Sequence, residues 1–196
     1  MTDGNFGAVS DNAPTDIDAA LAFLEADVYE FRSGYQRARV ARRIAGLSLD
    51  ARQRARARKY VLDVVDGKKH CTQQAVGQLA RAVADNSMRA TLRAKLHADN
   101  VHVARRALRT LSRVRHPDMS AADETAARAL VLSDAAFSAW LPPNVERLAR
   151  WLWSTEWEAE LRELTVHHGP ERAAAKRLIE TVDRRRDASK ARRPGP

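Results

Sequence analysis

The segment Leu92–Leu111 reads LRAKLHADNVHVARRALRTL and decides the fold. Leu92 and Leu96 lie one helical turn apart, and the pair Asp99-Asn100 then interrupts the pattern with residues that favour turns and helix caps. After the interruption an apolar stripe resumes at helical spacing, formed by Val101, Ala104, Leu108 and Leu111. The segment therefore predicts a helical hairpin, in which each amphipathic helix buries one apolar face.

The pattern of this hairpin recurs along the chain with a period of 32 residues. The equivalent positions are Ile44, Val76 and Leu108; Leu47, Leu79 and Leu111; and Val28, Tyr60 and Leu92. The period predicts three hairpins, over residues 17–47, 49–84 and 87–115. A single hairpin cannot bury its own stripe, whereas stacked hairpins form a continuous core. The alternative is a plain antiparallel bundle, because Ala-rich amphipathic helices of similar length also align by chance.

The rest of the chain is expected to be helical as well. No segment alternates polar and apolar residues between turn signals, so we predict no sheet. The fold class is all-α: an α-solenoid-like stack of helical hairpins with about ten helices. The 32-residue period fails after Pro117, which leaves an irregular helical bundle as the alternative for the C-terminal end.

Composition divides the chain into three parts. We expect residues 1–13 to be disordered and residues 14–183 to form a single helical domain, with hairpin repeats over 17–116 and a tryptophan-bearing cap over 117–183. Residues 184–196 are expected to form a basic flexible tail. Within the domain, Ser33-Gly34 is expected to end the first helix, while Ser48, Ser87 and Ser120 are expected to start later ones.

Several classes of protein are excluded by composition. The only cysteine is Cys71, so the chain forms no internal disulfide and no Cys-rich zinc site. No stretch approaches the roughly 18 uninterrupted apolar residues of a membrane span. Residues 1–16 lack the basic and apolar regions of a secretion signal. We therefore expect a cytoplasmic protein that does not enter the membrane, of unknown oligomeric state.

The net charge of +9 hides a sharp segmentation. Residues 1–31 contain seven acidic and no basic side chains, whereas residues 32–116 contain 21 Lys or Arg against five acidic side chains. Residues 117–183 are acidic again, and residues 184–196 are basic. A basic block of this size attracts polyanions or an acidic protein. The alternative is a solvated helix face against which the acidic segments fold back.

The second helix of each predicted hairpin carries a row of polar side chains opposite the core. At about 100° per residue, position 42 points away from Ile44 and Leu47, and its equivalents are Gln74 and Arg106. The complete predicted basic face consists of Arg39, Arg42, Gln74, Arg105, Arg106, Arg109 and Arg113. Arginines arranged in this way would contact phosphate oxygens without reading bases.

The tryptophans are concentrated in the predicted cap. They are Trp140, Trp151, Trp153 and Trp157. Trp153 and Trp157 lie one turn apart if a single helix continues through Ser154. Aromatic side chains at helical spacing usually belong to a core, so a hydrophobic cap is the favoured interpretation. The alternative is an exposed aromatic patch that serves as a protein interface or a base-stacking pocket.

The third hairpin resembles a HEAT-type repeat. The resemblance rests on Leu92, Leu96, the turn residue Asp99 and the second-helix segment Val103-Ala104-Arg105-x-Ala107-Leu108-x2-Leu111. It covers about residues 17–115 and weakens in the first two hairpins. The resemblance implies an α-solenoid that serves as a binding surface or scaffold. Some proteins of this fold are DNA glycosylases for alkylated bases, although no motif of this chain carries that activity over.

No pattern in the chain predicts catalysis, a metal or a cofactor. The histidines lack ligand spacing, Gly-rich phosphate loops are absent, and Cys71 has no candidate base near it in sequence. The sequence thus favours a binding protein that uses its Arg-rich face to bind an acidic protein or nucleic acid. The two alternatives are a sequence-independent DNA- or RNA-binding protein and, by fold resemblance alone, a DNA-repair glycosylase-like enzyme.

Overall fold

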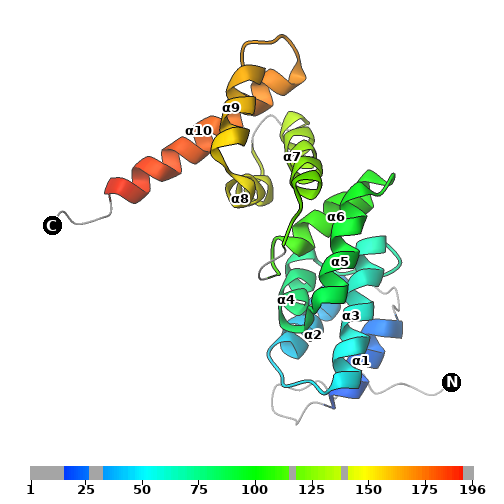
Figure 1. Cartoon of the computed structure of the whole chain (residues 1–196). Coiled ribbons are helices and arrows are strands. Elements are labelled where there is room, and N and C mark those ends of the chain that lie inside the picture. The colour runs from blue at the N-terminus through cyan, green and yellow to red at the C-terminus, as the bar shows by residue number, and fades with distance from the viewer. Residues whose placement is uncertain (1–15, 27–32, 115–117, 138–140, 192–196) are drawn as a thin grey trace. The chain divides into compact units, whose positions relative to one another are not determined.

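The structure is a computed structural model that describes residues 16–26, 33–114, 118–137 and 141–191. The described residues form ten α-helices and one short 3-10 helix. Figure 1 labels the α-helices in chain order. These described ranges contain no strand, so the predicted all-α fold is confirmed. None of the helices within them combines the length and the apolar character needed to cross a membrane.

The chain divides into two compact units, where we expected one domain over residues 14–183. Unit 1 is Met1–Arg89 and unit 2 is Ala90–Pro196, so the boundary falls inside helix α5 (Asn86–Ala94). The helices of each unit bury their apolar stripes against helices of the same unit. The third predicted hairpin, over 87–115, therefore begins in one unit and continues in the other.

Unit 1 contains two helical hairpins. Its helices are α1 (Ile17–Ala26), α2 (Ser33–Ala45), α3 (Ala51–Asp66) and α4 (Gln73–Val83), followed by the start of α5. Helices α1 and α4 each pack against both α2 and α3. The first helices of the two hairpins thus contact each other, and so do the second helices. This pairing is the one expected of two stacked repeats, while the solenoid of three hairpins stays a prediction.

Local side-chain chemistry sets the ends of the helices in unit 1. Helix α3 begins at a capping box, in which Asp50 Oδ1 accepts from the Gln53 backbone N at 2.7 Å and Gln53 Oε1 accepts from the Asp50 N. The helix ends at Gly67, whose φ of 81° suits glycine. The expected cap at Ser48 is wrong, because Leu49 is buried and the helix starts two residues later.

Two other helix boundaries differ from the sequence expectation. Ser33 and Gly34 were expected to end a helix but are the first residues of α2. The fifth helix begins one residue before Ser87, because Asp85 Oδ1 accepts from the Met88 backbone N at 2.8 Å. At the fifth helix, Asp85 therefore takes the capping role expected of Ser87.

The repeat positions in unit 1 form its core. Ile44, Tyr60 and Val76 are buried, as the period predicts. Leu47 is exposed instead, because α2 ends at Ala45 and Leu47 lies beyond the helix that would direct it inward.

Two arginines tie the helices of unit 1 together. Arg37 of α2 is buried, and its Nη1 donates to the backbone oxygen of His70 at 3.1 Å. Arg56 of α3 donates from Nε and Nη2 to the two carboxylate oxygens of Glu25 in α1, at 2.9 and 2.7 Å, and also pairs with Asp18. The acidic N-terminal region therefore neutralises part of the basic segment within unit 1.

Unit 2 is built around its last helix. Its elements after α5 are η2 (Lys95–His97), α6 (Val101–Leu111), α7 (Ala121–Ala136), α8 (Pro143–Leu152), α9 (Thr155–Leu164) and α10 (Pro170–Ala191). Helix α6 packs on η2 and α7, while α10 packs on α7, α8 and α9. Helix α10 runs through Ala191 where we expected a flexible tail from residue 184, because neither glycine nor proline interrupts residues 171–193.

Most of the predicted caps in unit 2 are present. Ser120 and Asp123 form the expected capping box of α7, and Ser154 Oγ accepts from the Trp157 backbone N at the start of α9. Asn100 caps α6, so Val101 occupies its first position and is exposed, although we expected it in the core. Leu108 and Leu111, which are repeat positions of the 32-residue period, are buried.

Candidate functional site

The predicted basic face contributes three side chains to unit 1. Arg39 and Arg42 are exposed on α2, and Gln74 is exposed in the first turn of α4, which packs beside α2. Arg42 forms no ion pair with any described residue. Unit 1 thus presents two exposed arginines on α2, with the neutral Gln74 on the neighbouring helix.

The four predicted residues of unit 2 are less accessible than the sequence indicated. Arg105 Nε lies 2.5 Å from Asp134 Oδ1 of α7, and Arg109 Nη2 lies 3.3 Å from Asp134 Oδ2. These two arginines are therefore bound to a carboxylate within their own unit. Arg106 and Arg113 are half-buried.

A group of arginines that we call the arginine cluster joins α6 to α8. It consists of Arg109, Arg113, Arg147 and Arg150. Arg147 Nη1 donates to Ser112 Oγ at 2.8 Å, which holds the side chain beside the C-terminal end of α6. Arg109 lies in the last turn of α6 and Arg113 lies two residues past its end, whereas Arg147 and Arg150 are one turn apart on α8.

The arginine cluster contains more positive charge than its surroundings balance. Arg109 shares Asp134 with Arg105, and Arg150 Nε lies 3.9 Å from Glu146, which is closer to Arg185. Within the described part of the chain, Arg113 and Arg147 pair with no carboxylate. The C-terminus of α6 offsets only part of this repulsion through its partial negative charge.

Within the arginine cluster, the surroundings of Arg147 destabilise its positive charge. Burial lowers the pKa of its guanidinium, and the positive charges of Arg113, Arg150 and Arg109 lower that pKa further. A half-buried cation whose charged neighbours are also cations destabilises the unit unless an anion binds to it. The arginine cluster is therefore the strongest candidate for a functional site in unit 2.

A hollow of about 240 Å³ adjoins the arginine cluster through Arg109. Its lining residues are Arg105, Arg109, Asp134, Phe137, Pro142, Asn144 and Val145. Phe137 is the C-cap residue of α7 and is 85% exposed. The hollow thus places an exposed aromatic ring beside arginines and a side-chain amide.

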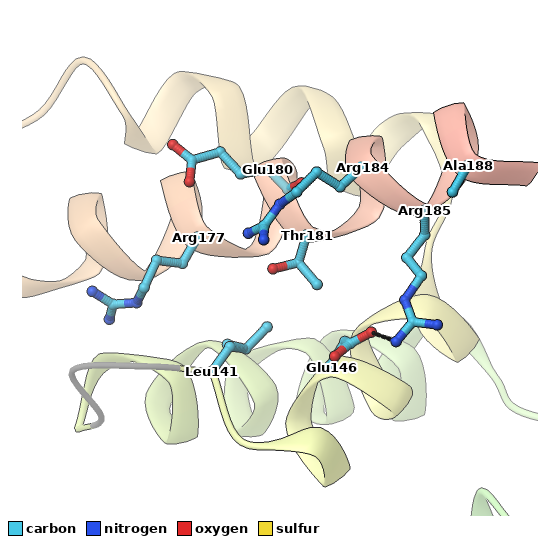
Figure 2. Close-up of a pocket in the computed structure, with 8 residues that line it drawn as sticks. All are labelled: Leu141, Glu146, Arg177, Glu180, Thr181, Arg184, Arg185 and Ala188. Atoms are coloured by element: carbon cyan, nitrogen blue, oxygen red, sulfur yellow. Dashed lines mark hydrogen bonds and ion pairs between the residues drawn. The ribbon is translucent and has the colours of Figure 1, made fainter. Parts of the chain in front are cut away.

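A larger hollow of about 710 Å³ lies between α10 and the start of α8. Figure 2 shows Arg177, Glu180 and Arg184 on α10 opposite Leu141, and Arg185 reaching Glu146. The Arg185–Glu146 ion pair measures 3.0 Å, and Arg177 Nη2 donates to the Ala135 backbone oxygen at 2.7 Å. Because its arginines have partners and two glutamates balance them, this hollow is a weaker anion site than the arginine cluster.

Three of the four tryptophans lie within the described residues, and Trp140 lies outside them. Trp157 is buried in the first turn of α9, Trp151 is half-buried on α8, and Trp153 is half-buried between the two helices. The rings of Trp153 and Trp157 meet edge to face, with centroids 5.6 Å apart and planes at 62°. A break at Ser154 separates them, so they do not share one continuous helix.

The carboxylate beside these rings is fully occupied by hydrogen bonds. Glu158 accepts from Arg162 at 2.7 Å, from Arg186 at 3.0 Å and from Trp153 Nε1 at 3.2 Å. The guanidinium of Arg186 also lies 5.7 Å from the ring centre of Trp153. The tryptophans and their carboxylate therefore link α9 and α10.

The hydrogen bonds to Glu158 predict a dependence of stability on pH. Donation by Arg162, Arg186 and Trp153 lowers the pKa of Glu158 from its usual 4.5 to about 2. The stabilisation is therefore complete above pH 4.5 and is lost as the pH falls toward about 2. We expect Glu158→Gln to flatten the fall in unfolding free energy between these pH values, as measured by urea unfolding at several pH values. Identical slopes for the variant and the parent would contradict this assignment.

Metal binding and thiol chemistry have little support among the described residues. No group of three or more His, Cys, Asp or Glu side chains in the described ranges is arranged to hold a metal ion. Cys71 is half-buried, and burial raises the pKa of its thiol, which disfavours the reactive thiolate.

Comparison with known proteins finds no matching family model, no similar curated protein and no similar solved structure. Arg147, Arg150, Phe137 and Asn144 were not predicted as site residues from the sequence. Their only sequence signal was the spacing of Arg147 and Arg150 on one face of the helix that follows Pro142-Pro143.

Proposed function

We propose that this chain is a non-catalytic binding protein whose arginine-rich helical surfaces bind an acidic partner. The observation that carries the proposal is the half-buried Arg147, whose positive charge is destabilised by the charges of three other arginines and whose guanidinium donates to a hydroxyl and to no carboxylate among the described residues. An anion bound there would accept from several guanidinium groups and relieve their mutual repulsion. Arg39 and Arg42 add an exposed basic surface on unit 1.

Two further expectations belong with this proposal. The pairing of α1 with α3 and of α2 with α4 supports a HEAT-like arrangement of hairpins as the scaffold of the binding surfaces. The single cysteine supports a cytoplasmic location, since the chain has no disulfide that would indicate an oxidising compartment.

The proposal predicts salt-sensitive binding of a simple polyanion. Calorimetric titration of the full chain with heparin should show affinity that falls about tenfold or more between roughly 50 and 200 mM NaCl. The double variant Arg113→Ala/Arg147→Ala should bind about tenfold more weakly at the lower salt, because each arginine supplies charge-assisted hydrogen bonds. Its thermal stability should equal or exceed that of the parent, because a repulsive pair has been removed.

The matched control is Arg52→Ala/Arg54→Ala, which removes the same charge from two exposed side chains of α3. Its affinity for heparin should stay within about twofold of the parent. Absence of heparin binding at low salt would refute the proposal. Equal losses in the two double variants would show that net charge alone binds the polyanion and that the arginine cluster is no site.

A further inference from the structure

The most exposed large apolar side chain of the described residues lies beside the arginine cluster. Phe137 is 85% exposed at the end of α7 and lines the hollow together with Arg109. A single exposed apolar side chain is common on protein surfaces, so the ring is relevant because it lies beside arginines and is open to stacking. The basic segment, residues 32–116, contains no tryptophan, and the fold places the exposed ring of Phe137 beside the arginines at the end of α6.

The hollow offers polar groups around this ring. Asn144 lines it with a side-chain amide, which both donates and accepts hydrogen bonds. The Nε atom of Arg109 is buried and makes no hydrogen bond within the described residues. Donors without acceptors are costly, so a ligand that supplies acceptors here would be bound favourably.

The size of the hollow limits the size of the ligand that can bind there. Pockets that enclose a small molecule usually measure about 300–1,000 Å³, and this hollow is smaller at about 240 Å³. It does not enclose a cofactor-sized ligand. A single planar ring lying on Phe137, with its edge toward Asn144 and the arginines, fits a site of this size and openness.

The ring and the cations form one surface. Arg109 belongs to both the hollow and the arginine cluster, and the Arg147–Ser112 hydrogen bond of 2.8 Å holds α8 at the same end of α6. Aromatic side chains interleaved with arginines are typical of sites for single-stranded nucleic acid, where bases stack and phosphates pair. A duplex keeps its bases stacked on one another and presents no ring face to Phe137.

We infer that Phe137, Asn144 and the arginine cluster form a binding site for single-stranded nucleic acid. An unstacked base lies on the ring of Phe137, and the adjoining phosphates accept hydrogen bonds from Arg113 and Arg147. The binding is independent of sequence, because stacking and phosphate contacts are common to all bases. This inference rests on the proposed function and specifies the partner of the same site.

The test is a fluorescence-anisotropy titration of the full chain with labelled oligothymidylate of about 20 nucleotides, compared with a duplex of the same length. The single strand should bind more tightly than the duplex. Phe137→Ala should weaken binding of the single strand by about 5- to 100-fold and leave duplex and heparin binding unchanged. Phe137→Tyr should retain the parent affinity, since it keeps the stacking ring.

A matched control removes an exposed aromatic side chain from unit 1. Tyr35 is 79% exposed on α2, and Tyr35→Ala should not change the affinity for oligothymidylate. All of these substitutions are at exposed positions, so thermal melting should be unchanged and a loss of binding would not reflect unfolding.

The remaining outcomes separate the inference from the function on which it rests. Duplex affinity equal to single-strand affinity, with no effect of Phe137→Ala, would overturn the inference while heparin binding left the proposed function standing. Binding of polyglutamate as tight as that of oligothymidylate, weakened equally by Phe137→Ala, would assign the surface to an acidic protein and overturn the inference. Loss of all polyanion binding would refute both.

Discussion

Replacement of Trp157 by alanine is expected to lower the free energy of unfolding of unit 2 by about 3–5 kcal/mol. Only 2% of Trp157 is exposed, its ring meets Trp153 edge to face, and the guanidinium of Arg128 lies 5.9 Å from its ring centre. The substitution therefore removes a large buried surface, an aromatic contact and a cation–π contact together. Urea unfolding followed by the fluorescence of the remaining tryptophans measures the loss.

The control for this prediction is Trp157→Phe, which keeps an aromatic ring in the same place. It should recover more than half of the free energy lost in Trp157→Ala, because most of the buried surface is retained. A loss of less than about 1 kcal/mol in Trp157→Ala would contradict a core role. The aromatic group between α8 and α9 would then have to be reconsidered as a surface for a ligand.

Arg37→Ala is expected to destabilise unit 1 by about 3 kcal/mol. Arg37 is 1% exposed, so its removal creates a cavity at the centre of the α2–α4 packing. The backbone oxygen of His70 also loses the donor that lies 3.1 Å away. Hydrogen exchange of peptides within residues 33–83 measures this change, because it reports unit 1 separately from unit 2.

The matched control for Arg37 lies on the same helix. Arg42 is exposed, and Arg42→Ala removes the same type of side chain at a cost of less than about 0.5 kcal/mol. Arg37→Met should fall between the two, because it fills part of the cavity but supplies no donor. Equal protection from exchange in Arg37→Ala and Arg42→Ala would show that the buried arginine does not hold α2 to the chain before α4.

Helix content and helix starts followed from local chemistry and were largely predictable. Asn100 and Ser120 cap helices at the expected positions, since an N-cap depends on residues within three positions of it. The cap at Asp50 was missed because the burial of Leu49, a tertiary effect, selects it over Ser48. Leu47 and Val101 were misplaced for a related reason, as each lies at or beyond a helix end.

The candidate site was less predictable, because it depends on contacts between helices distant in sequence. Helical spacing predicted Arg105, Arg109 and Arg113 on one face, although Arg113 lies beyond the end of α6. Helical spacing contained no information on Asp134, which binds Arg105 and Arg109. It also contained none on Arg147, which lies on α8 and is repelled by the charge of Arg113. The number of Lys and Arg side chains in residues 32–116 therefore overstated the positive charge available to a partner. It also did not indicate that α8 contributes two arginines to the arginine cluster.

The boundary inside α5 also sorts the fluorescent side chains by type. All three tyrosines, Tyr29, Tyr35 and Tyr60, precede it, and all four tryptophans follow it. Tryptophan fluorescence therefore reports on unit 2 alone. The unlabelled chain thus carries an optical probe that would separate the response of unit 2 to a bound partner from that of unit 1.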